Sequence, residues 1–152
     1  MHAFISSRLD FCNALYTGIP DYNLHLLQLI QNYAAKLVLN KKKFDHAKPL
    51  LRKLHWLPIK KRIDFKSLLI CYEAQHSLAP EYIQQLFSPY NRLSHLRNLA
   101  PNTLLTPKFE LNSMGGRAFS VYTPVKWNQL SLEIRNSESL PIFKKTVKNS
   151  PF

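Results

Sequence analysis

Apolar residues recur at helical spacing over much of the chain, most regularly between residues 22 and 39. One stripe there consists of Leu26, Ile30, Tyr33 and Leu37, with Leu27, Ala34 and Val38 beside it. Residues spaced three and four apart lie on the same face of an α-helix. The pattern therefore predicts an amphipathic helix that packs through this stripe, with Asp21 placed to cap its N-terminus.

Shorter apolar patterns predict further helices on both sides of this one. Residues 3–16 are loosely helical and end at Gly18 and Pro20, which favour a helix stop. Pro58 suits the first turn of a helix with a wide apolar face that continues to about His76. Short helices are also expected over residues 46–55, from Pro80 to Phe87, and after Ser139.

The helical pattern breaks between Ser88 and Thr103, where the sequence is polar and basic and has no period. We therefore expect a loop or linker at 88–103, between a helical subdomain (1–87) and a small α+β segment (104–152) that packs on it. Residues 104–112 have extended character and Gly115 and Gly116 turn the chain, which predicts a small β-hairpin near 104–122. The predicted fold is mainly α, an irregular bundle of about six helices.

Composition agrees with this picture. The chain has 152 residues, enough for one domain with a core, and only 3 glycines against 10 prolines, which favours helices joined by stiff turns. Two distant cysteines indicate neither a disulfide framework nor a zinc motif, so we expect a reduced intracellular protein, cytoplasmic or nuclear. The N-terminus does not resemble a signal peptide, and no apolar run of about 18 residues predicts a membrane span.

Charge is the strongest feature of the composition. The formal net charge is +12, with 21 Lys and Arg against 9 Asp and Glu. Such a chain attracts polyanions, so RNA or DNA bound through phosphates is the favoured partner. An anionic membrane, an acidic protein, or no partner at all for a merely soluble basic protein are the alternatives. The candidate nucleic-acid-binding residues are Lys41, Lys42, Lys43, Lys60, Lys61, Arg62, Arg92, Arg97, Arg117, Lys144, Lys145 and Lys148.

Each candidate contact also has a structural interpretation. A basic cluster can be a solvated face, and the interleaved aromatic residues at positions 90, 109, 119 and 122 can be core rather than stacking platforms for bases. The stretch LHWLPIKKRIDFK (54–66) shows the same ambiguity. We interpret Trp56 and Leu57 as a packing corner between two helices. Lys60, Lys61 and Arg62 are consecutive and span roughly 300° of a helix, so they cannot all face one phosphate.

Motifs for catalysis are missing from the sequence. Three glycines cannot form a phosphate-binding loop, the six histidines are scattered, and the carboxylates form no DxD set for two-metal chemistry. Cys71 and His76 are five positions apart, a poor match to one helix face. We therefore expect no catalytic residue, no cofactor, no metal and no small-molecule substrate.

Several stretches together resemble a known family. They are SRLDFCNALYTGIP (7–20), LQLIQNYAAKLVL (27–39), the long segment from LLRKLHWLP to YIQQLF (50–87), GGRAFSVYTPVKWNQL (115–130) and SLPIFKKTVK (139–148). In this order they look like the C-terminal region of the open reading frame of non-LTR retrotransposons, in the jockey-like and chicken-repeat-like groups of reverse transcriptases. The resemblance covers nearly the whole chain.

The resemblance implies a non-catalytic segment of an RNA-directed DNA polymerase. What is similar begins after the palm, with residues 1–16 as a helix derived from the thumb, and the catalytic aspartates of the family's F/YADD signature have no counterpart here. In that family the C-terminal region is associated with holding template RNA or target DNA, so the resemblance implies a basic accessory region. The resemblance also implies that the polymerase domains of the parent protein are a further partner.

This sequence departs from the family pattern at some positions. The usual LP..IR segment reads Leu130-Ser131-Leu132-Glu133-Ile134-Arg135, and the usual Ile-Thr-Pro before LHWLP is Ala47-Lys48-Pro49. Such drift is typical of a truncated copy. Two alternatives to nucleic-acid binding therefore stay open: an inert mobile-element remnant, or a protein-interaction module that docked on the missing polymerase domains.

Overall fold

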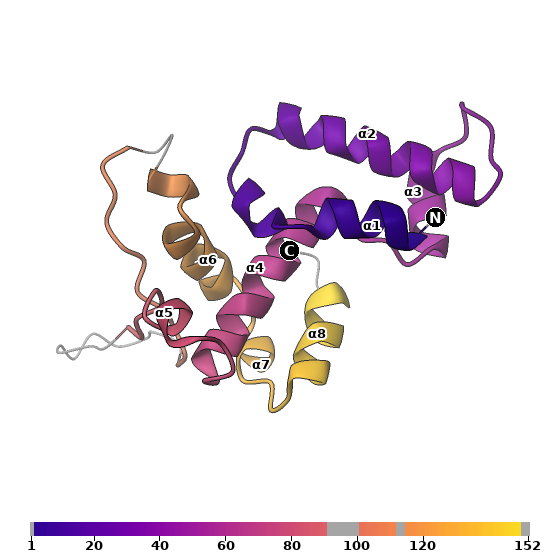
Figure 1. Cartoon of the computed structure of the whole chain (residues 1–152). Coiled ribbons are helices and arrows are strands. Elements are labelled where there is room, and N and C mark those ends of the chain that lie inside the picture. The colour runs from indigo at the N-terminus through magenta and orange to yellow at the C-terminus, as the bar shows by residue number, and fades with distance from the viewer. Residues whose placement is uncertain (1, 91–100, 112–114, 150–152) are drawn as a thin grey trace. The chain divides into compact units, whose positions relative to one another are not determined.

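The computed structural model describes residues 2–90, 101–111 and 115–149, and in these residues it is mostly helical (Figure 1). Its elements are α1 (His2–Asp10), η1 (Asn13–Tyr16), α2 (Asp21–Val38), α3 (Ala47–Lys53), α4 (Ile59–Gln75), α5 (Glu81–Gln84), η2 (Gly115–Arg117), α6 (Phe119–Asn128), α7 (Leu132–Arg135) and α8 (Leu140–Asn149), where η marks 3₁₀-helix. The predicted mainly α fold is confirmed. No helix in the described ranges is long and apolar enough to cross a membrane.

The chain divides into two compact units, Met1–Ile63 and Asp64–Phe152, which we call unit 1 and unit 2. Helix α4 contributes residues to both. This division differs from the predicted one at 88–103. The reason is that apolar residues of α4, such as Leu68 and Tyr72, form one core cluster with Trp127 of α6 and Phe143 of α8. Residues 64–87 therefore group with the C-terminal part of the chain.

In unit 1, α2 packs through a different face from the predicted one. Figure 1 shows α1 beside α2 and α3 near the C-terminal end of α2. The contact with α3 is made by Ala34 and Ala35, which cluster with Leu50, Leu51 and Trp56. The predicted packing stripe is instead exposed: Leu26 by 47%, Ile30 by 55%, Tyr33 by 54% and Leu37 by 65%. The helix was predicted correctly and its packing face wrongly, because small alanines permit the closer approach.

Several helix ends use left-handed residues other than glycine. Asn40, His55 and Ser77 have φ between 51° and 57° and follow the ends of α2, α3 and α4. At the end of α3, the Trp56 N–H donates to the Leu51 carbonyl at 2.9 Å and the His55 N–H donates to the Arg52 carbonyl at 3.0 Å. These are the two hydrogen bonds of a Schellman motif. His55 therefore serves to end a helix, and the chain turns there towards α4.

The predicted capping role of Asp21 is wrong. Pro20 occupies the cap position of α2, no side chain caps the helix, and Asp21 lies in the first turn. A carboxylate in the first turn still interacts favourably with the positive end of the helix dipole.

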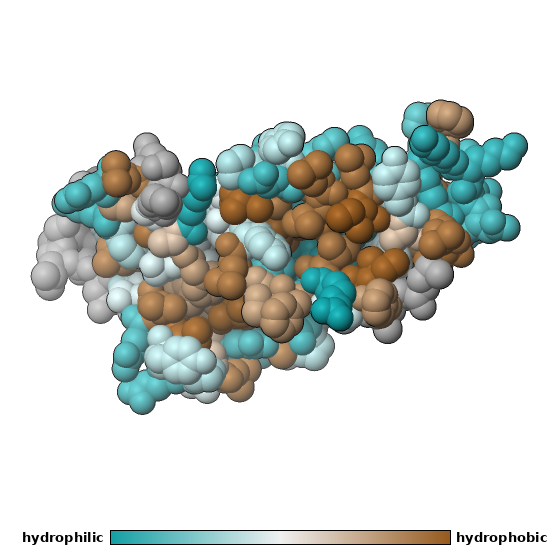
Figure 2. Space-filling model, turned by 45° about the horizontal axis from the view of Figure 1, so that its top comes forward, coloured by the Kyte–Doolittle hydropathy of each residue, from teal (hydrophilic) through white to brown (hydrophobic). Residues whose placement is uncertain are grey.

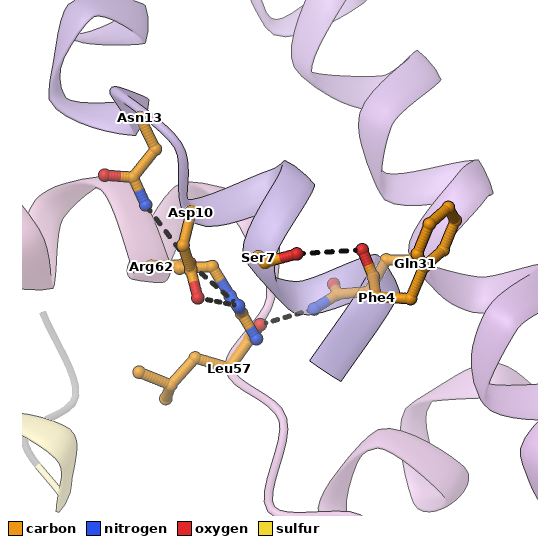
Figure 3. A network of polar contacts seen from close by, with 7 residues as sticks. All are labelled: Phe4, Ser7, Asp10, Asn13, Gln31, Leu57 and Arg62. Atoms are coloured by element: carbon orange, nitrogen blue, oxygen red, sulfur yellow. Dashed lines mark hydrogen bonds and ion pairs between the residues drawn. The ribbon is translucent and has the colours of Figure 1, made fainter. Parts of the chain in front are cut away.

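Two amide side chains of α2 hold the corner that LHWLP forms. The Gln31 side chain is fully buried, and its amide donates to the Leu57 carbonyl at 2.9 Å (Figure 3). The Gln28 side-chain oxygen accepts from the Ile59 N–H at 2.9 Å. With Trp56 only 5% exposed, the predicted packing corner is confirmed.

In unit 2, the side chains of α6 and α7 hold an extended segment. The Asn128 side chain donates to the Leu104 carbonyl and accepts from the Leu104 N–H, both at 2.9 Å. The Trp127 indole donates to the Asn102 carbonyl at 3.0 Å. Arg135 is 5% exposed and donates to Pro101, Asn102 and Thr103. The family-like residues Trp127, Asn128 and Arg135 are therefore structural in this chain.

The predicted β-hairpin near 104–122 is wrong for the residues that the structure describes there. In 101–111 the extended chain forms one isolated bridge, between Pro89 and Leu104, and residues 119–128 are the helix α6. Val121 and Trp127 are buried on α6, so their apolar spacing belongs to a helix rather than to a strand.

Candidate nucleic-acid interface

The predicted basic residues of unit 1 separate into an accessible group and a paired group. Lys41, Lys42 and Lys43 follow the end of α2 and are all exposed. The Lys42 backbone N–H donates to the Asp45 carboxylate at 2.9 Å, which shapes the turn and leaves the lysine side chain outside it. These three lysines remain good candidates for phosphate contacts.

The second predicted group, on the first turn of α4, is largely engaged within the protein. The Arg62 guanidinium donates to both oxygens of Asp10 at 2.8 Å, and its side chain is only 13% exposed (Figure 3). Lys60 pairs with Asp21 at 2.9 Å, although both side chains are well exposed. Lys61 is half-buried. Arg62 is therefore a structural residue that joins α4 to the end of α1.

The predicted residues of unit 2 form a weaker group. Lys145 and Lys148 are exposed on α8, while Lys144 and Arg117 are half-buried. The Lys148 ammonium lies 5.3 Å from the centre of the Phe65 ring, a cation–π distance. Arg92 and Arg97 lie outside the described residues.

Sequence analysis missed the cations of α3. Lys48, Arg52 and Lys53 are exposed, and Lys48 and Arg52 are four apart, so they share a face of the helix. Because α3 packs on α2, these cations belong to the same hairpin as Lys41–Lys43. We call residues 36–53 the basic hairpin; its seven cations are Lys36, Lys41, Lys42, Lys43, Lys48, Arg52 and Lys53. The spacing of the basic residues within AKPLLRK (47–53) could have indicated that they share a helix face.

The charge of the basic hairpin is nearly uncompensated. Its one carboxylate, Asp45, accepts the Lys42 backbone N–H. Within the part of the chain that the structure describes, none of its seven cations forms an ion pair. Residues 1–63 contain 11 Lys and Arg against three acidic residues, whereas residues 64–152 contain ten against six. The positive potential is therefore concentrated in unit 1.

An open cleft of about 790 Å³ borders the basic hairpin. Gln28 and Asn32 of α2, Lys48 and Pro49 of α3, and Pro58 are among its lining residues. The Gln28 amide donates to Gln31 and Asn32 at 2.9 Å, so the polar groups on the α2 side are already hydrogen-bonded to one another. The cleft therefore provides a concave surface and the positive charge of Lys48, rather than a set of polar groups that converge on a ligand.

The aromatic candidates are divided between core and surface. Tyr90 and Phe109 are 42% and 40% exposed, while Phe119 and Tyr122 are half-buried. Phe119 packs against Phe87 with ring centres 5.5 Å apart, and the Tyr122 hydroxyl donates to Asp64 at 2.6 Å. The core interpretation therefore fits Phe119 and Tyr122, and the two others have accessible rings.

Groups with catalytic potential are buried or dispersed. Burial raises the pKa of the Cys71 thiol, which leaves it protonated and unreactive at neutral pH. Asp64 is 3% exposed and accepts from Tyr122, with the Lys126 ammonium 3.6 Å from its second oxygen. Nowhere in the described residues do three His, Cys, Asp or Glu side chains gather as a metal ion would require.

Comparison of the chain with protein-family models, curated proteins and solved structures finds no match in any of the three.

Proposed function

We propose that this chain is a non-catalytic, basic accessory segment that binds RNA or DNA through phosphates, and that the basic hairpin is its contact surface. The observation that carries the proposal is the gathering of seven cations within residues 36–53, none of them in an ion pair in the described part of the chain. Nucleic acid is a dense row of phosphates, and lysine and arginine bind it by releasing its counterions.

The placement of these cations fits a contact with a backbone better than with bases. The three loop lysines are exposed, and Lys48 and Arg52 present charge from one face of α3. Phosphate contacts position a protein on nucleic acid and carry no sequence information directly. The proposed binding is therefore nonspecific, and it weakens steeply as the salt concentration rises.

The test compares two variants that each remove three positive charges. In the first, Lys41, Lys42 and Lys43 become Ala; in the control, Lys144, Lys145 and Lys148 become Ala. We expect the hairpin variant to lose about tenfold in affinity at moderate salt, equally for all sequences, and its salt slope to flatten by about two to three. The control is expected to lose less than about threefold.

Filter-binding titrations with single-stranded RNA and duplex DNA between low and moderate salt give both quantities. Unchanged affinity of the hairpin variant would contradict the proposal. Equal losses in both variants would show that net charge, rather than the basic hairpin, drives the binding.

We also propose the origin that the sequence resemblance implies, a C-terminal segment that follows the palm of a non-LTR retrotransposon reverse transcriptase. The residues that carry it are the LHWLP corner and the WN…IR group, and both have coherent structural roles here. The nucleotide sequence upstream of Met1 tests this origin. An intact or decayed polymerase palm in the same reading direction is expected, and unrelated coding sequence there would contradict it.

One observation favours a second candidate function, docking on the polymerase domains of a parent protein. Phe4, Phe11 and Leu15, within the segment proposed to derive from the thumb, are exposed by 70%, 74% and 78%. Apolar groups exposed to this extent are typical of a surface that another domain covers. Binding of the chain to those domains that survives high salt, and that Phe11→Ser with Leu15→Ser removes, would favour docking over nucleic-acid binding.

A further inference from the structure

Helix α2 carries a second apolar face that no described residue covers. It consists of Tyr22, Leu26, Leu29, Ile30, Tyr33 and Leu37, each between 36% and 73% exposed. We call it the apolar stripe. The face of α2 that packs in unit 1, with Leu24, Gln31 and Ala35, lies on the opposite side of the helix. Figure 2 shows a broad apolar patch on the face of the molecule that is turned towards the viewer.

The spacing of the apolar stripe is that of a helix-pairing surface. Leu26, Ile30, Tyr33 and Leu37 follow one another at intervals of four, three and four residues. This alternation places side chains along a narrow line to which a second helix can pack at a shallow angle. No acidic or basic side chain interrupts the stripe; Lys36 lies at its edge, with its ammonium 5.8 Å from the Tyr33 ring centre.

We propose that the apolar stripe is a homodimer interface, in which α2 packs antiparallel on α2 of a second copy of this chain. An interface between identical copies related by a two-fold axis must be self-complementary. The apolar stripe meets this condition when the axis passes between residues 31 and 32. Leu26 then lies opposite Leu37 of the second copy, and Ile30 opposite Tyr33, so that these four apolar side chains meet one another.

The charges at the two ends of α2 favour the same arrangement. Asp21 begins the helix with a side chain that is 78% exposed, and Lys41–Lys43 follow its end. In the antiparallel arrangement the dipoles of the two helices oppose each other favourably. A parallel pair would instead bring the two lysine loops together and repel.

The size of the apolar stripe also fits a dimer. From their exposed fractions, its six side chains present at most about 700 Å² per copy, below the roughly 800 Å² that each partner buries in a standard interface, which fits a weak dimer. The net charge of +12 per chain opposes association at low salt, because two like-charged molecules must approach. We therefore expect a dimer with a Kd on the order of 10 μM that strengthens as salt screens the repulsion.

Sedimentation of the full chain, freed of nucleic acid, measures this association between about 1 and 200 μM, a range chosen to span the expected Kd. The variant Leu26→Ser with Ile30→Ser is expected to weaken dimerisation more than tenfold, since both side chains are exposed in the single chain. A matched control, Leu78→Ser with Tyr82→Ser, changes exposed apolar residues of unit 2 and is expected to leave the dimer intact.

Disulfide cross-linking tests the register directly in a Cys12→Ser background. Mixing Leu26→Cys chains with Leu37→Cys chains is expected to give a cross-linked pair, whereas either variant alone gives little. Cross-linking of Leu26→Cys with itself would indicate parallel pairing and overturn the proposed arrangement. A chain that stays monomeric at 200 μM, about twenty times the expected Kd, would overturn the proposed dimer.

These experiments test the proposed dimer and the proposed nucleic-acid binding separately. Salt weakens the phosphate contacts and favours the dimer, and the Leu26→Ser, Ile30→Ser variant keeps every cation of the basic hairpin. Loss of dimerisation with retained binding to RNA would therefore leave the proposed function standing.

Discussion

At the scale of single residues, the polar side chains that matter most are those buried against backbone far away in the sequence. Arg135 is the clearest case in unit 2. It is 5% exposed, and one of its terminal nitrogens donates to the carbonyls of Pro101 and Asn102 and to the Thr103 hydroxyl. Burial lowers the pKa of its guanidinium, so the charge is held at a cost that these hydrogen bonds offset.

The first prediction concerns Arg135. Arg135→Met is expected to lower the free energy of unfolding by about 2–3 kcal/mol, because it removes the hydrogen bonds of a charged group that tie α7 to residues 101–103. Arg135→Lys keeps the charge but lacks the planar fork, and we expect it to recover less than half of the loss. Urea unfolding measures both variants, and wild-type stability of Arg135→Met would contradict a structural role.

The structural roles of these buried polar side chains could not be predicted from the sequence. Gln31 and Leu57 are 26 positions apart, and Arg135 and Asn102 are 33 apart, so nothing local indicates their hydrogen bonds. His55 is similar, because its left-handed conformation at the end of α3 replaces the glycine that a sequence pattern would look for. By contrast, the corner at Trp56 was predictable, since a large apolar residue before proline separates two apolar helices.

At the scale of elements, helix positions were predictable and packing faces were not. Apolar residues recur at helical spacing on two sides of α2. Hydrophobicity alone favours the side with the larger side chains, the apolar stripe, as the packing face. The structure places small residues inside, with Ala35 fully buried against α3. Close approach of two helix backbones depends on the geometry of the partner helix, which a single sequence does not contain.

The second prediction decides between the two faces of α2. Ala35→Leu is expected to destabilise the chain by about 1–3 kcal/mol, because the added atoms must enter a packed contact. Leu37→Ala, on the exposed face, is expected to change stability by less than about 0.5 kcal/mol in the monomer. Thermal unfolding at low protein concentration measures both changes. A larger loss of stability for Leu37→Ala than for Ala35→Leu would instead support the packing face inferred from the sequence.

At the scale of the whole molecule, the candidate interface was predicted in part. The net charge and the loop lysines are evident from composition and clustering. The distinction between Lys41–Lys43 and Arg62 is not, because it depends on Asp10 reaching Arg62 from a distant helix. The cations of α3 join the loop lysines only through the packing of α3 on α2.

The third prediction concerns stability at alkaline pH, which sums the proton equilibria of the whole chain. Burial raises the pKa of the Cys71 thiol and of the Tyr72 hydroxyl above their ordinary values of 9.0 and 10.0. Both groups are neutral in the folded chain at pH values where the unfolded chain has ionised. Their contribution is therefore complete below pH 9 and is lost as the pH rises, by about 1.4 kcal/mol per pH unit for each group that ionises only on unfolding.

Urea unfolding between pH 7 and pH 11, with the thiols kept reduced, measures this slope. Cys71→Ala is expected to delay the decline by about one pH unit, because only Tyr72 then remains of the pair. Cys12→Ser is the control, since Cys12 is exposed, and it should leave the profile unchanged. A profile that is flat up to pH 11 would mean that Cys71 and Tyr72 ionise as easily in the folded chain as in the unfolded one. That outcome would place them outside the core that joins α4 to α8.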